Sequence, residues 1–141
     1  MSELVITLLR VVCDEVTDDF LEGLTDEFGW RITATGAPGE TPLFREEIPM
    51  AGMESVAAGS KHELNRELWR LGPEWQEARL EFWDKDTFSR DDMLGRIEIT
   101  RDGKGSFTVQ AGESAEDVGE GAFRLTGEGG DYKVWISFRE S

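Results

Sequence analysis

Short segments in which apolar and polar residues alternate recur along the sequence, and glycine-rich breaks separate them. In residues 28–35 (FGWRITAT) and 77–83 (EARLEFW), apolar side chains fall on every second position. A period of two is typical of a strand with one face in the core and one in water. The other segments of this kind are residues 3–13, 95–100, 105–110, 122–126 and 131–138. The 16 glycines fit many tight turns, so the sequence predicts an all-β fold, an antiparallel sandwich.

The middle of the chain departs from this pattern. Residues 48–60 have no clean period and are expected to form a loop. Three leucines in residues 61–71 recur at helical spacing: Leu64, Leu68 and Leu71. We therefore expect one domain over residues 1–141, with a loop or short-helix insertion at about 48–72.

Charge and cysteine content exclude several classes of function. The chain carries 15 Lys and Arg against 30 Asp and Glu, a formal net charge of −15, which repels the phosphate backbone of nucleic acid. One cysteine and one histidine are too few for a tetrahedral zinc site. With 38% hydrophobic residues, the chain can build a core and is not an acidic disordered tail.

Carboxylates concentrate in two places. Residues 14–27 (DEVTDDFLEGLTDE) contain seven and no Lys or Arg, and residues 84–92 (DKDTFSRDD) contain four directly after a predicted strand. Asp84 and Asp86 can direct oxygens to a common point at the strand end, where the chain returns at Asp91 or Asp92. Clustered oxygens of this kind suit Ca²⁺, which takes about six to eight of them. An EF-hand starting at Asp84 would have Gly95 in place of the glutamate at its twelfth position, so the ligands must come from separate loops.

The segment FWDKDTFSRDDMLGRIEI resembles the third calcium-binding loop of the C-two domain, the β-sandwich of synaptotagmins and protein kinase C. The resemblance places Asp84, Asp86 and Asp92 on the family's three loop-three aspartates. It places Ser89 on an auxiliary ligand and Gly95 on a turn glycine.

A second segment, LTDEFGWRI, resembles the family's loop one, with Asp26 on the loop-one aspartate and Glu27 in place of the usual proline. The other loop-one aspartate of the family then corresponds to Asp19 or Asp18. Between the two loops, LNRELW is similar to the family's L-N-P-x-W segment without its proline.

The resemblance implies an eight-stranded antiparallel Greek-key sandwich. Because the chain starts at the strand before loop one, the implied topology is the circularly shifted, phospholipase C type. The implied cofactor is Ca²⁺, and the implied partners are anionic phospholipid or a protein. Phe20, Leu21 and Phe88 would lie at the loop tips that contact the membrane or partner.

Two other functions are compatible with the sequence. The chain could be a calcium-independent protein–protein adaptor, or a metal-dependent hydrolase, which would need a deep pocket behind the acidic loops. The lone histidine, His62, has no partner that suggests catalysis, so we expect a binding module and not an enzyme.

Three smaller expectations complete the sequence-based picture. The apolar run at residues 4–12 is interrupted by polar residues and lacks a basic segment before it, so we expect no signal peptide or membrane span. We therefore expect a cytoplasmic protein, either free or attached to a membrane surface. Cys13 is expected to be buried and unreactive, and the five tryptophans are expected to lie in the core.

Overall fold

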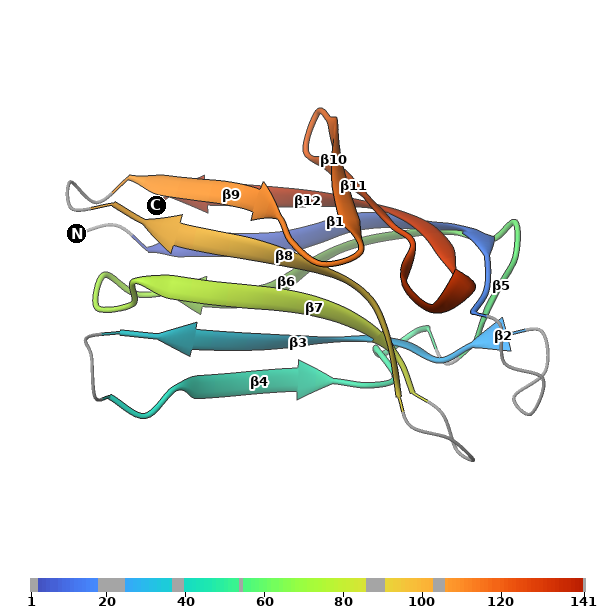
Figure 1. The fold of residues 1–141 in the computed structure, drawn as a ribbon, viewed down its shortest axis with the longest axis horizontal. Coiled ribbons are helices and arrows are strands. Elements are labelled where there is room, and N and C mark those ends of the chain that lie inside the picture. The colour runs from blue at the N-terminus through green and yellow to red at the C-terminus, as the bar shows by residue number, and fades with distance from the viewer. Residues whose placement is uncertain are drawn as a thin grey trace.

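The fold consists of antiparallel β-sheets packed face to face (Figure 1). The computed structural model describes residues 3–17, 25–36, 40–53, 55–85, 91–102 and 106–140. The strands are β1 (Leu4–Glu15), β2 (Thr25–Asp26), β3 (Phe28–Thr35), β4 (Leu43–Glu47), β5 (Val56–Ala57), β6 (Lys61–Leu71), β7 (Glu77–Asp84), β8 (Asp92–Arg101), β9 (Phe107–Ala111), β10 (Ala115–Gly119), β11 (Ala122–Leu125) and β12 (Asp131–Glu140). A 3₁₀ turn, Gly127–Gly129, precedes β12.

Two sheets of five strands enclose the core. Sheet one has the order β10-β11-β12-β1-β6, sheet two has the order β4-β3-β7-β8-β9, and β2 and β5 form a separate short pair. The first and last long strands are neighbours, with Leu4 opposite Glu140, so the two ends of the described chain lie close together (Figure 1). The structure thus confirms an all-β sandwich.

Alternation along the strands creates the core, as the sequence predicts. In β7, Ala78, Leu80 and Phe82 are buried, while the residues between them face outward. One hydrophobic cluster extends along the chain from Leu4 to Ile136. All seven segments predicted as strands form strands, with ends shifted by a few residues.

The predicted helix at residues 61–71 is wrong, because this segment is β6, paired with β1. Its register slips twice, and one slip lies at Leu68, between the pairs Ile6↔Trp69 and Thr7↔Glu67. An extra residue in a strand reverses the alternation beyond it. Inward leucines therefore fall four and then three residues apart, which imitates a helix.

Two other segments differ from the sequence-based expectation. Residues 48–60, expected to be a loop, supply three fully buried side chains (Met50, Met53 and Val56) and the strand β5. The acidic stretch 113–120 has no strand-like alternation in its sequence, yet it contains β10, which is exposed along most of its length. The described residues contain twelve strands in place of the eight expected.

The tryptophans are only partly in the core. Trp30 is buried, and Trp69 and Trp75 are partly buried against the core. Trp83 and Trp135 are only partly buried, and a guanidinium covers each ring: Arg31 lies 4.4 Å from the ring centroid of Trp83, and Arg10 lies 4.9 Å from that of Trp135. Cys13 is buried, as predicted.

Candidate functional site

Several strand ends meet at the end of the sandwich that carries β2 and β5 (Figure 1). Asp84 ends β7, where it pairs across the sheet with Phe28 on one side and Asp92 on the other. Asp26 lies in β2, immediately before β3. Tyr132 enters from the start of β12, opposite Cys13 of β1. Antiparallel pairing thus brings together groups that are far apart in the sequence.

Asp26 is the centre of a buried hydrogen-bond network. Its side chain is only 2% exposed, yet its oxygens accept bonds from the main-chain N–H of Thr17 (2.9 and 3.2 Å) and from the Thr17 hydroxyl (2.7 Å). The Tyr132 hydroxyl also donates to Oδ2. A carboxylate accepts about four hydrogen bonds, so Asp26 is close to saturated.

Asp84 lies beside this network and needs a proton. Its Oδ1 accepts the main-chain N–H of Glu27 at 2.7 Å, and its Oδ2 lies 2.8 Å from the Thr17 hydroxyl. That hydroxyl has one hydrogen and already lies 2.7 Å from Asp26. One of the two contacts therefore requires a second proton, which a neutral Asp84 carboxyl supplies.

The electrostatics agree with this arrangement. Burial first, and then the negative charge of Asp26, raise the pKa of Asp84 to about 7. None of the ion pairs formed by described residues includes Asp26 or Asp84. A proton or a cation must therefore offset the negative charge here.

The other two buried titratable groups remain neutral. Burial and the charge of Asp26 raise the pKa of the Tyr132 hydroxyl far above its usual range. Burial raises the pKa of the Cys13 thiol to about 11, although its hydrogen bond with Tyr132 lowers that pKa. Neither group can act as a base or nucleophile near neutral pH.

The structure locates three of the residues predicted to bind metal. Asp26, Asp84 and Asp92 lie at one end of the sandwich. The Thr17 hydroxyl contacts both Asp26 and Asp84, and strand pairing places Asp84 opposite Asp92. The remaining predicted site residues lie outside the described residues: Asp18, Asp19, Phe20, Leu21, Asp86, Phe88 and Ser89. Sequence reasoning missed Thr17 and Tyr132, since no local pattern links either of them to Asp26.

The assignment of Gly95 to a turn is wrong. Gly95 lies within β8 opposite Phe82, and a Cβ there would come within 2.6 Å of the Leu125 side chain. Its lack of a side chain allows β11 to pack closely over β8.

The fit of these residues to Ca²⁺ differs from one carboxylate to the next. Asp84 and Asp92 are hard oxygen ligands at one strand end, and Asp84 has lone pairs that no described donor uses. Asp26 would have to exchange a bond from Thr17 or Tyr132 to bind an ion. Among the described residues, no group of three or more His, Cys, Asp or Glu is placed to hold a metal. The surroundings of Asp84 are therefore suited to a calcium ligand, whereas those of Asp26 are suited to a residue that supports the ligand.

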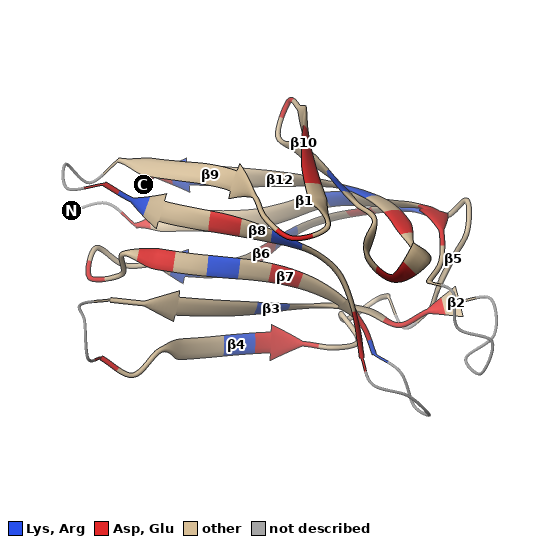
Figure 2. Cartoon of the chain, viewed as in Figure 1, with Lys and Arg blue, Asp and Glu red and all other residues tan. Residues whose placement is uncertain are grey.

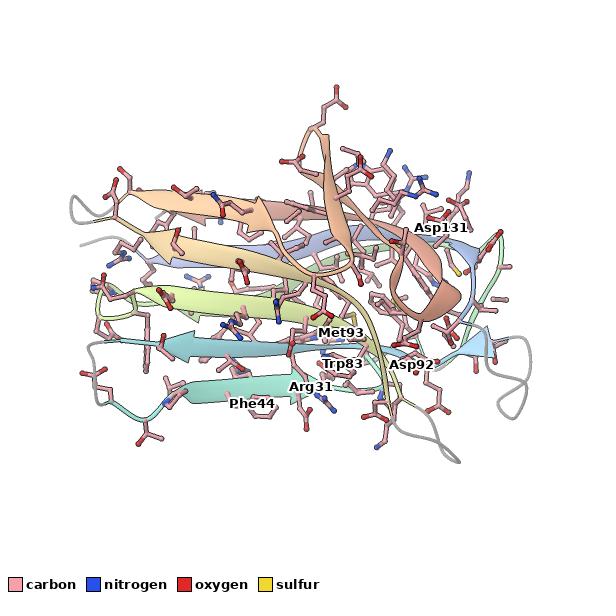
Figure 3. The ribbon with its side chains drawn as sticks, viewed as in Figure 1. Arg31, Phe44, Trp83, Asp92, Met93 and Asp131 are labelled. Carbon is pink, nitrogen blue, oxygen red and sulfur yellow. The ribbon has the colours of Figure 1, made fainter. Side chains whose placement is uncertain are left out.

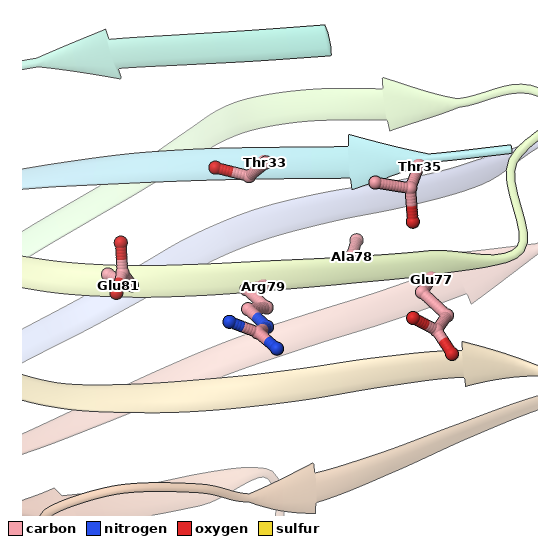
Figure 4. A pocket seen from close by; sticks show the side chains of 6 residues that line it. All are labelled: Thr33, Thr35, Glu77, Ala78, Arg79 and Glu81. Carbon is pink, nitrogen blue, oxygen red and sulfur yellow. The ribbon is translucent and has the colours of Figure 1, made fainter. Parts of the chain in front are cut away.

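Other hollows occur on the outer face of sheet two. One, of about 380 Å³, lies beside Trp83 and is lined by Arg31, Asp91, Met93 and Glu128, and Figure 3 shows Arg31, Trp83 and Met93 close together. Another, of about 230 Å³, follows β7 between Thr33 and Arg79 (Figure 4). Neither is lined by Asp26, Asp84 or Asp92.

Comparisons with known proteins assign no family. The sequence matches no protein-family model and no curated protein. The described part of the chain contains no helix with the length and hydropathy needed to cross a membrane.

Proposed function

We propose that this chain is a calcium-binding module of the C-two type that binds an anionic phospholipid surface or a protein partner when Ca²⁺ is present. The observation that carries the proposal is the strand-end group formed by Asp26, Asp84 and Asp92. It buries negative charge without an ion-paired Lys or Arg at Asp26 or Asp84, and both Asp84 and Asp92 belong to the segment FWDKDTFSRDDMLGRIEI that resembles the family's loop three.

The physical argument is that a cation replaces a proton. The Asp84 carboxyl is neutral in the network because burial and Asp26 disfavour its charge. A divalent ion next to Asp84 stabilises the charged form, so ion binding releases the proton. The cluster is thus poised between a protonated and a metal-bound form.

The fold supports the proposal at the level of architecture. A sandwich whose first and last long strands are paired is compatible with the circularly shifted, phospholipase C type of C-two topology. The eight-stranded Greek-key topology is part of the proposal. The twelve strands of the described residues then include strands beyond those eight. The proposed location is the cytoplasm or the membrane surface facing it, and the proposed module is not an enzyme.

Calorimetric titration of Ca²⁺ into chelator-stripped protein tests the proposal directly. Asp86→Asn and Asp84→Asn should each abolish most binding, whereas Asp117→Asn in the β10–β11 hairpin removes the same charge and should leave the affinity unchanged. Equal losses in all three variants would indicate diffuse screening. No heat of binding in the unmodified protein would refute the calcium site.

Thermal unfolding gives a second readout. An ion bound only by the folded state adds about 2.7 kcal/mol at roughly a hundredfold excess over its dissociation constant. In Asp84→Asn the increase should vanish, while the ion-free protein becomes more stable above about pH 7, where a charged Asp84 carboxylate would repel Asp26. A common melting curve in Ca²⁺ and in chelator would contradict the proposal.

Cosedimentation with phosphatidylserine vesicles distinguishes the partners. At a net charge of −15, attraction to an anionic surface has to be local, through the bound ions and the apolar residues Phe20, Leu21 and Phe88. Binding that rises with Ca²⁺ and falls in Phe88→Ala supports the membrane. Calcium binding without cosedimentation favours a calcium-dependent protein partner. If Ca²⁺ does not bind either, the calcium-independent adaptor takes the place of both.

A further inference from the structure

Each five-stranded sheet ends in two strands that are paired on one side only. These edge strands are β10 and β6 in sheet one and β4 and β9 in sheet two. An edge strand exposes main-chain N–H and C=O groups on which another chain can form a strand, and proteins usually protect edges with charges, prolines or bulges. The four edges can therefore be compared by the protection that each carries.

Three of the edges are protected. The sequence of β4 is LFREE and follows Pro42, which has no N–H to donate. The sequence of β6 is KHELNRELWRL, which is rich in charge, and its pairing slips twice. The edge strand β10 is acidic, and its pairing with β11 also slips.

The fourth edge, β9, has none of these features. Its sequence, FTVQA, contains no charge and no proline, and its five residues pair with β8 without a slip. In Figure 2, β9 contains no charged residue, whereas β4, β7 and β8 do. In a chain with a net charge of −15, β9 is the one uncharged edge among the four edges of the two five-stranded sheets.

The hydrogen bonds show which main-chain groups of β9 are available. Asp102 N donates to Ser106 O, and Gly112 N donates to Arg96 O, so hydrogen-bonded pairs flank β9 at both ends. Because such pairs alternate in an antiparallel ladder, Thr108 and Gln110 bond to β8. The N–H and C=O groups of the three other residues point away from β8: Phe107, Val109 and Ala111. Their side chains are partly buried against the core.

We propose that β9 is a self-association edge at which two copies of this chain pair antiparallel about Val109. In this register Val109 faces Val109 of the second copy, and Phe107 faces its Ala111. Each of these pairs forms two main-chain hydrogen bonds, about six in all. On the other face, Thr108 lies opposite Gln110, and no charge faces a like charge anywhere in the contact.

The choice of a second copy as the partner follows from charge and symmetry. Two molecules at −15 repel each other wherever acidic surfaces approach, and β9 is the edge of the five-stranded sheets that has no charge of its own. The same five residues also pair a large side chain with a small one under a two-fold axis, as an isologous contact requires.

Size and charge set the expected strength. A contact of five residues per chain is smaller than the roughly 800 Å² per partner of a stable interface, so the dimer is weak and depends on concentration. Salt shortens the range of the repulsion to about 3 Å at 1 M. We therefore expect dimerisation to increase with salt.

Sedimentation equilibrium from micromolar to millimolar protein, at low and high salt, tests this directly. The double variant Thr108→Glu/Gln110→Glu places like charges opposite each other twice and should weaken the dimer about tenfold. Thr108→Glu/Gln110→Lys changes the same positions but places opposite charges together, and it should restore the dimer. Melting curves verify that both variants fold.

A matched control addresses the β4 edge. Leu43→Glu/Phe44→Glu adds the same two charges at exposed positions, 45% and 55% accessible, and should leave the dimer intact at high salt. The proposal is overturned by a monomer at every concentration and salt, by species larger than a dimer, or by a failure of the Glu/Lys pair to restore association. Equal loss in the β4 variant would assign the contact to that edge.

Discussion

Of two acidic regions that look alike in sequence, one contributes a buried carboxylate and the other has all of its carboxylates exposed. Residues 14–27 carry seven carboxylates and residues 113–120 carry four. In the first region Asp26 is buried in a network with Thr17 and Tyr132. In the second, the carboxylates of the β10–β11 hairpin are exposed to solvent.

The difference shows that position at a strand end, and not the number of charges, creates a site with its own chemistry. In the hairpin, water screens each carboxylate, and Asp117 only accepts the N–H of Gly119 at the turn. At the buried end, Asp84 and Asp26 both contact the Thr17 hydroxyl and are almost fully buried, so the charge of Asp26 changes the protonation of Asp84. We expect this difference in geometry to appear also in the unfolding free energy.

The largest expected effect is a loss of stability as pH rises in calcium-free buffer. The Asp84 carboxyl has a pKa raised from 3.8 to about 7 in the folded protein, so the folded state holds an extra proton between these values. The unfolding free energy therefore falls as pH increases from about 4 to 7 and levels off above, by up to ~4 kcal/mol.

Urea unfolding at a series of pH values measures this slope. Asp84→Asn keeps the acceptor for the Glu27 N–H but cannot titrate, so the difference between the two proteins isolates Asp84. Asp117→Asn, in the exposed hairpin, should follow the unmodified protein at every pH. Identical pH profiles for the unmodified protein and Asp84→Asn would mean that burial of Asp84 does not change its titration, in contradiction to the difference between the two regions.

The second effect concerns the network itself. Asp26→Ala leaves the N–H of Thr17 and the Tyr132 hydroxyl buried without this acceptor, which should cost about 3 kcal/mol. Glu116→Ala, in the exposed strand β10, should change the unfolding free energy by less than about 0.5 kcal/mol. Chemical denaturation of both variants at one pH measures the two losses in unfolding free energy. Similar small losses would mean that the buried network contributes little to stability.

The sequence predicts the strands that bury one face and misses the others for physical reasons. A period of two identifies β3 and β7 because every second side chain enters the core. Such a signal is missing from β10, because almost none of its side chains is buried, and bulges distort the signal in β6.

The same limit applies to the site: the sequence predicts its acidic residues but not the residues that bond to them. Asp26, Asp84 and Asp92 follow from acidic residues at strand ends and from the resemblance to loop sequences of the C-two family. Thr17 and Tyr132 do not follow, because the bond from Tyr132 to Asp26 spans 106 residues and depends on how the two sheets face each other. Sequence patterns report a residue's own strand, whereas the network depends on the packing of several strands.

The smallest of these effects belongs to one hydroxyl. Tyr132→Phe keeps the ring that packs against Phe28 but removes the hydrogen bond to Asp26, and it should cost about 2 kcal/mol because the acceptor is buried and the bond is charge-assisted. The matched change in the hairpin is Asp117→Ala, which removes the acceptor of the Gly119 N–H. Water replaces that exposed bond, so the loss should stay below about 0.5 kcal/mol.

Chemical denaturation of Tyr132→Phe and Asp117→Ala at one pH measures the two losses in unfolding free energy. A loss in Tyr132→Phe no larger than that in Asp117→Ala would mean that the buried network does not depend on the Tyr132 hydroxyl.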